Sequence, residues 1–121
     1  MDGQKKYRPV IGEDKDYHIK EPSGGIYKEL KMLMLHSAVS GVPEKLAIAK
    51  EFKLIKDFSD KEELKKFEEK LKQEEINIEQ FMESVFKSIF IEKNDVVKFD
   101  ILNLNQVSQA ISDFFTLASG S

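Results

Sequence analysis

The chain carries few side chains that could do chemistry, and its two histidines are the first to consider. His18 lies in a segment that we expect to be extended, and His36 lies in a predicted helix. Neither has a second ligand at the spacing of a metal site, and the chain has no cysteine. No serine lies in a nucleophile-elbow sequence. We therefore expect ordinary surface or boundary histidines, and no catalytic, cofactor-binding or metal-binding residues.

Acidic side chains cluster in one loop near the start of the chain. Glu13, Asp14 and Asp16 could hold a cation, because hard metal ions take carboxylate oxygens. Their spacing matches no complete calcium loop, and Lys15 stands among them. A solvated turn is the simpler interpretation.

Two further motifs could bind phosphate or nucleic acid. Gly24-Gly25 precedes a predicted helix, whose positive end attracts anions, but the Gly-Lys-Ser/Thr ending of a P-loop is missing. We expect these glycines to allow the turn into the helix. Lys5, Lys6 and Arg8 form a small basic cluster, which is typical of an ordinary terminus.

The overall composition excludes several classes of partner. The net charge of −3 and the pI near 5.5 argue against a nucleic-acid surface. No segment has the roughly 18–20 consecutive apolar residues of a membrane span, and the start has no apolar stretch like that of a signal peptide. We expect one domain of 121 residues in the cytoplasm, with no membrane partner.

Apolar residues are concentrated in the last third of the chain, where charge is sparse. Residues 76–121 hold three lysines and six acids, whereas residues 41–75 hold nine lysines and ten acids. This contrast indicates a solvated middle and a C-terminal part that must bury its surface. Six of the nine phenylalanines fall in that part: Phe81, Phe86, Phe90, Phe99, Phe114 and Phe115.

The pattern predicts a mainly α fold with about five helices and a small N-terminal β-hairpin. Residues 5–11 and 16–20 flank a polar, glycine-containing loop, as hairpin strands do. A lone hairpin is marginal in water, so it must dock on the rest of the chain or pair with another chain. We divide the chain into a hairpin arm and turn, residues 1–25, and a helical body, residues 26–121.

Helix starts and stops are marked along the body. The first helix is predicted over 26–39, and Pro43 fits the first turn of the second. Ser59 with Glu62 predicts a capping box for the third. The third helix carries only a narrow apolar stripe, formed by Leu64, Phe67 and Leu71. A fourth helix is predicted over 77–91, and a strand or extended connection over Val96–Ile101. Asn103 with Gln106 predicts the cap of a fifth helix.

The fourth and fifth helices carry unusually wide apolar arcs, roughly 180° and 160° of the helical wheel. Packing on one neighbour needs only about 100°. Two interpretations stay open: these helices are central in the core, or part of their faces forms a groove or a self-association surface. For the second, we expect the partner contacts on Met34, Phe81, Phe86, Phe90, Phe114 and Phe115.

One segment resembles a known family. Tyr17-His18-Ile19-Lys20-Glu21-Pro22-Ser23-Gly24-Gly25 is similar to the strand and Glu-Pro-Ser/Thr-Gly-like turn of the small tail assembly chaperones of long-tailed bacteriophages, which attend the tape-measure protein. An acidic, helix-rich body of this size follows in both. The resemblance implies a task without catalysis: covering the long apolar helices of the tape-measure protein until the tail tube encloses them. It also implies self-association.

We accordingly expect a non-enzymatic tail assembly chaperone that binds amphipathic helices of the tape-measure protein. Two alternatives come from other classes. One is a small DNA-binding regulator, with the second and third helices as a helix-turn-helix, although Asp60-Lys61-Glu62-Glu63 is a poor surface to present to phosphates. The other is a small hydrolase or metal enzyme.

Overall fold

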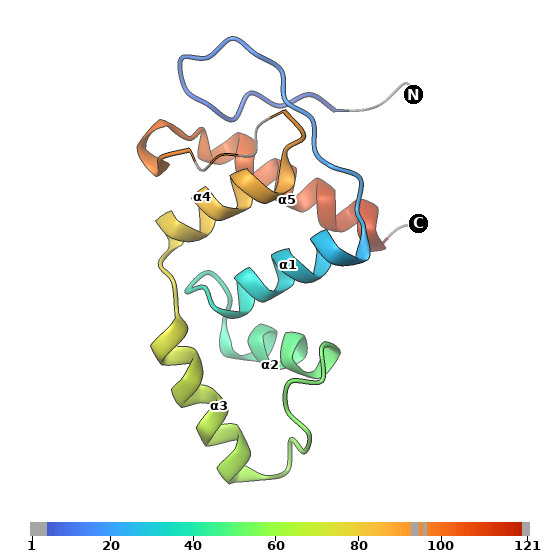
Figure 1. The fold of residues 1–121 in the computed structure, drawn as a ribbon, viewed down its shortest axis with the longest axis vertical. Coiled ribbons are helices and arrows are strands. Elements are labelled where there is room, and N and C mark those ends of the chain that lie inside the picture. Colours follow the sequence, from blue (N-terminus) through green and yellow to red (C-terminus); the bar gives the residue numbers. More distant parts are fainter. Residues whose placement is uncertain (1–4, 93–94, 96, 120–121) are drawn as a thin grey trace. The chain divides into compact units, whose positions relative to one another are not determined.

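The computed structural model describes residues 5–92, 95 and 97–119. Within these residues the chain is mainly helical, as expected, and forms no extended sheet (Figure 1). The helices, in chain order, are α1 (Gly24–Leu35), α2 (Val42–Glu51), α3 (Lys61–Glu74), α4 (Ile78–Ile89), the short 3-10 helix η1 (Phe99–Ile101) and α5 (Leu104–Ser119).

Two compact units make up the fold. The first combines Met1–Leu30 with Met82–Ser121, and the second is Lys31–Phe81. The N-terminal arm therefore belongs to the same unit as α5. The second unit contains α2, α3 and the last turns of α1.

The predicted N-terminal β-hairpin is wrong. Tyr7 and Tyr17 form a single antiparallel bridge, with N···O distances of 2.9 and 2.7 Å, and the pairing does not continue into a ladder. The two arms diverge to different partners, because Val10 bridges to Leu102 and Ile19 bridges to Phe90. Long-range pairing with the rest of its own unit thus replaces a local hairpin. The arm therefore docks on the rest of its own chain in this structure.

Aromatic side chains from the arm and from α4 form the centre of the first unit. The Phe86 and Phe90 rings lie 5.3 Å apart, centroid to centroid, and the Tyr17 ring lies 5.8 Å from each. Tyr7 meets Phe90 edge to face at 6.0 Å. The wide apolar arc of α4 is therefore covered by residues that precede it by some 70 positions in the chain.

Both tyrosine hydroxyls in this cluster donate to carboxylates. Tyr7 donates to Asp113 and Tyr17 donates to Glu13, each at 2.5 Å. Burial raises the pKa of Tyr17 to about 12, and the bond to the Glu13 carboxylate adds to the shift. Burial and the Asp113 carboxylate raise the pKa of Tyr7 in the same direction. The folded state thus holds both phenolic protons more tightly than an unfolded chain does.

We predict that the free energy of unfolding falls as the pH rises from 10, the ordinary tyrosine pKa, towards 12. Below pH 10 both states keep the proton and the full stabilisation is present. Tyr17→Phe removes one ionising group, so its stability should decline less steeply over this range, although loss of the Glu13 bond costs about 1 kcal/mol at neutral pH. Urea unfolding followed by circular dichroism at several pH values measures both slopes. Equal slopes for the two proteins would contradict the assignment.

The cap of α3 lies one residue after the position that the sequence predicts. The carboxylate of Asp60, and not the hydroxyl of Ser59, accepts from the backbone N–H groups of Glu62 and Glu63 at the start of α3. Ser59 instead donates to Asp57. The predicted Ser59–Glu62 capping box is therefore wrong by one residue, because Asp60 caps a helix as well as Ser59 does and the backbone path places Asp60 at the start of α3.

The cap predicted for the fifth helix is confirmed. The side-chain oxygen of Asn103 accepts from the backbone N–H of Gln106 at 3.3 Å, and α5 begins at the next residue after Asn103. Before it, Phe99–Ile101 form a 3-10 turn and not the strand or extended connection that we predicted, while Val96 lies outside the described residues. The backbone N–H of Phe99 donates to Glu83, which holds this turn on α4.

The first helix ends at Leu35, four residues before the predicted end. Beyond Leu35 the backbone pairs with the segment that follows α3: Ser37 and Ile76 form a parallel bridge, and the N–H of Ile76 donates to the carbonyl of His36. The backbone of residues 36–38 therefore pairs with Ile76 and does not continue the helix. It also fixes the C-terminal ends of α1 and α3 beside each other.

The second helix ends in a Schellman motif that has a lysine where glycine is usual. The N–H of Leu54 donates to the carbonyl of Ala49, and the N–H of Lys53 donates to that of Lys50. Lys53 has φ = 56°, a left-handed conformation that glycine adopts without strain. The motif turns the chain sharply, so that Leu54 and Ile55 leave α2 at a defined angle.

Candidate functional site

Four of the six residues predicted to contact a partner are interior residues. Phe86, Phe90 and Phe114 are 0% exposed and Phe81 is 4% exposed. Their side chains fill the cores of the two units and offer no surface in this structure. Burial of these four side chains argues against them as partner contacts, although Ile78 of α4 and Leu104 and Leu117 of α5 are 52%, 42% and 55% exposed.

The other two predicted contact residues are half-buried. Phe115 packs edge to face on Tyr27 with 5.9 Å between the ring centroids, and its ring also meets that of Phe114. Met34 lies near the end of α1. The structure places these two residues in different units, so it does not bring the six together as one surface.

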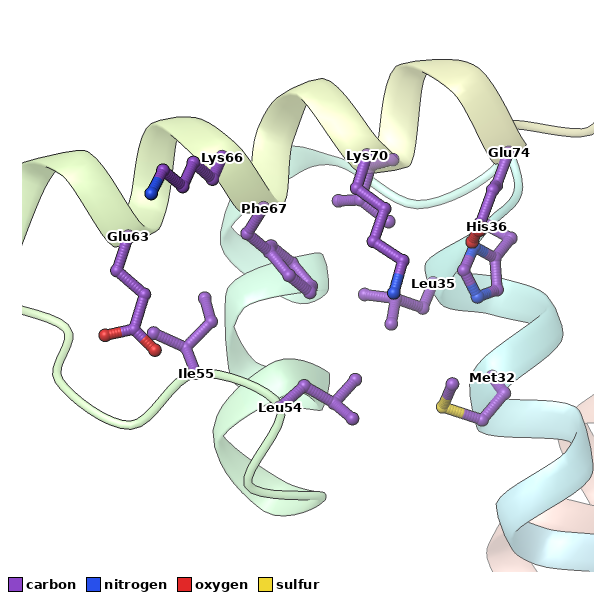
Figure 2. A pocket seen from close by; sticks show the side chains of 11 residues that line it. Met32, Leu35, His36, Leu54, Ile55, Glu63, Lys66, Phe67, Lys70 and Glu74 are labelled. Carbon is purple, nitrogen blue, oxygen red and sulfur yellow. The ribbon is translucent and has the colours of Figure 1, made fainter.

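A groove of about 500 Å³ opens within the second unit (Figure 2). Its lining comes from three places: the end of α1, the segment after α2, and one face of α3. The apolar part comprises Met32, Leu35, Leu54, Ile55, Phe67 and Leu71, and the polar part comprises His36, Glu63, Lys66, Lys70 and Glu74. Its volume lies in the range of ordinary ligand sites, roughly 300–1,000 Å³.

Local structure explains why these apolar side chains meet. The Schellman turn directs Leu54 and Ile55 away from α2, and the Asp60 cap starts α3 in the direction that brings its narrow stripe towards them. Ile55 is buried, whereas Leu54 is 39% exposed. Figure 2 shows Phe67 and Leu54 pointing into the opening from opposite sides. The groove is therefore open and apolar at its centre, and could receive apolar side chains of another molecule.

The acidic groups at the groove already have partners. Glu63 accepts from the backbone N–H of Lys56 at 2.8 Å. The Glu74 carboxylate lies 3.4 Å from Nδ1 of His36, at ion-pair distance. That nitrogen is buried and, among the described residues, has no hydrogen-bond partner. These interactions fasten α3 at both ends of the groove.

The two lysines at the groove differ from these acids. Lys66 and Lys70 are exposed, and neither makes an ion pair or hydrogen bond with any residue that the structure describes. Figure 2 shows Lys70 extending from α3 into the opening. The groove thus has an apolar centre and, on its α3 side, two lysines without an ion pair in the described part of the chain.

The acidic loop and the basic cluster near the N-terminus form ion pairs within the chain. Arg8 pairs with Asp14 at 2.8 Å and with Asp16 at 3.1 Å, so one member of the basic cluster contacts two carboxylates of the acidic loop. Lys5 pairs with Asp113. Over the described ranges, no three His, Cys, Asp or Glu residues gather closely enough to hold a metal ion.

His18 connects the N-terminal arm to Glu92. Its ring Nδ1 lies 2.5 Å from one oxygen of Glu92, and its backbone N–H donates to the other at 2.7 Å. Burial acts to raise the pKa of Glu92, but these bonds to His18 outweigh it and lower the pKa below its ordinary value. The pair ties the N-terminal arm to the end of α4.

The second and third helices do not have the geometry of a helix-turn-helix. Residues 52–60 separate α2 from α3, whereas that motif joins its helices by a turn of about three or four residues. The first turn of α3 also carries Glu62 and Glu63, which would face phosphates with like charge. The geometry gives no support to the DNA-binding alternative.

The groove was not predicted from the sequence, although parts of its signal are visible. The stripe of α3 marks Phe67 and Leu71 as apolar, but its narrow width does not indicate a groove. No described helix has the length and apolar character needed to cross a membrane. Comparison of the chain with family models, curated proteins and solved structures gave no match.

Proposed function

We propose that this protein is a non-enzymatic chaperone that holds amphipathic helices of a client protein. The client that we propose is the tape-measure protein of a long-tailed bacteriophage. The choice of client rests on the resemblance of residues 17–25 to tail assembly chaperones. The binding of helices rests on the groove in the second unit.

The observation that carries the proposal is the open apolar centre of that groove. An amphipathic helix buries anchors at i, i+3 or i+4, and i+7. We propose that such a row lies between α3 and the side chains of Leu54 and Met32, which line the groove. Methionine adapts to varied apolar shapes, which suits a chaperone that must hold many turns of a long client. Burial of apolar area at ~25 cal/mol per Å² contributes to the affinity, and the cost of ordering the two molecules offsets much of it.

The proposed contacts differ from those expected from the sequence alone. The buried phenylalanines of α4 and α5 cannot reach a client without unfolding of their unit. We therefore place the contacts on Leu54, Phe67 and Leu71, with Met32 as the adaptable neighbour. Self-association, which the resemblance implies, stays a prediction, and light scattering at several concentrations measures it.

Co-expression tests the proposal. A helical fragment of a tape-measure protein, insoluble when expressed alone, should become soluble in the presence of this chain and should copurify with it. The control is an unrelated acidic helical protein of similar size, which corrects for a general effect of net charge on solubility. If the fragment is equally insoluble in all three expressions, the chaperone function is refuted.

A further inference from the structure

We propose that the helix held in the groove carries two acidic residues one turn apart beside its apolar stripe, and that these pair with Lys66 and Lys70. This inference rests on the proposed function and specifies the chemistry of the client. It concerns one rim of the groove, on α3 (Figure 2).

The acidic and basic side chains of this rim differ in their contacts. Glu63 accepts from the backbone N–H of Lys56, and the Glu74 carboxylate lies 3.4 Å from Nδ1 of His36. Lys66 and Lys70 have no ionic or hydrogen-bonding partner in the described part of the chain. The two ammonium groups are therefore the charged groups of this rim that make no ion pair or hydrogen bond of their own within the described residues, and an acidic side chain complements them.

The spacing of the two lysines along α3 matches that of two acids on a client helix. Lys66 and Lys70 are four residues apart, so they rise about 6 Å along α3 and lie within roughly 40° of each other around its axis. Two acids at i and i+4 on a client helix have the same spacing. A client lying along α3 can thus meet both lysines at once while its apolar stripe covers Phe67 and Leu71.

The remaining lysines of α3 provide a matched control. Lys65 and Lys72 are exposed, do not line the groove, and lie roughly opposite the groove-lining residues around the helix. Replacing both by Glu changes the net charge as much as replacing Lys66 and Lys70 does. A comparison of the two double variants therefore separates a local charge contact from a general effect of net charge.

The experiment measures binding of helical peptides of about 20 residues, long enough to be substantially helical, to the full chain. One peptide has a leucine stripe flanked by two Glu at i and i+4, and a second has Lys at those positions. The Lys66→Glu, Lys70→Glu variant should bind the Glu peptide about tenfold more weakly at low salt and should gain affinity for the Lys peptide. The Lys65→Glu, Lys72→Glu variant should bind both peptides as the parent does. The effect should shrink at high salt.

Other outcomes overturn the inference in distinguishable ways. Equal Glu-peptide affinity of the parent and both variants would leave the chaperone function intact and refute the acidic pairing. If neither peptide binds and the tape-measure fragment stays insoluble, both proposals fail. If the peptides do not bind, but Lys66→Glu, Lys70→Glu turns a dimer into a monomer, the groove holds a second copy of the chain and the inference is refuted. Thermal unfolding of each variant, which should match the parent, verifies that the fold is intact.

Discussion

Replacing Phe86 with Ala is expected to lower the free energy of unfolding by about 3–5 kcal/mol and the melting temperature by roughly 10–20 °C. The ring is 0% exposed and packs on Tyr17 and Phe90, so its removal leaves a cavity in the first unit. All three tyrosines of the chain lie in Met1–Leu30, within the same unit. Tyrosine fluorescence during urea unfolding therefore reports this unit specifically.

Leu117→Ala is the control for this change. Leu117 belongs to α5 in the same unit but is 55% exposed, so we expect a change of less than about 0.5 kcal/mol. Suppose instead that Phe86→Ala is as stable as the parent. Phe86 would then not be an interior residue, and the wide face of α4 would again be available to a partner.

Replacing Leu54 with Glu is expected to weaken binding of an amphipathic helix by about tenfold or more. Leu54 points into the groove and is 39% exposed, so the variant should fold normally. The new carboxylate places a charge where apolar anchors dock, and it competes for Lys70 on the same groove. Titration of a fluorescently labelled leucine-striped peptide gives the dissociation constant of each protein.

Val42→Glu is the matched control for Leu54→Glu. Val42 is 62% exposed, belongs to the same unit and does not line the groove. A Glu in the first turn of α2 is also favourable for the helix, so the fold should tolerate it. Binding by this variant should equal that of the parent. Equal losses in the two variants would mean that added negative charge, and not the groove, governs binding.

Much of the helical layout could be predicted from local signals. Pro43 at the start of α2 and Asn103 before α5 act through the nearest turn of backbone, so their effects are visible in the sequence. The cap of α3 was displaced by one residue because Ser59 and Asp60 are both good caps, and only the actual backbone path decides between them. The early end of α1 depends on pairing with Ile76, which no local signal reveals.

Burial of the C-terminal phenylalanines could not be read from helix periodicity alone. A wide apolar arc indicates that a helix has neighbours on more than one side, but not what they are. Here the neighbour of α4 is the N-terminal arm, whose Tyr7, Tyr17 and Ile19 are interior residues. The same long-range contacts explain why the predicted hairpin is absent. Both errors come from treating the arm as separate from the helical body.

The groove was missed for a related reason. Its apolar residues are contributed by three segments, and Leu54 and Ile55 are positioned by a turn that depends on the left-handed conformation of Lys53. A lysine gives no sequence signal for that conformation, whereas a glycine would have. The unpaired state of Lys66 and Lys70 likewise depends on which acids the fold brings near them.

The central claim is that the groove within Lys31–Phe81, and not the phenylalanines of α4 and α5, receives a helical client. Methyl-labelled NMR of the full chain, titrated with the Glu-bearing leucine peptide, tests it most directly. The claim predicts that the methyl signals of Met32, Leu54 and Ile55 shift, while those of Leu104 and Leu117 stay in place. Shifts at Leu104 and Leu117 with unchanged groove signals would contradict it.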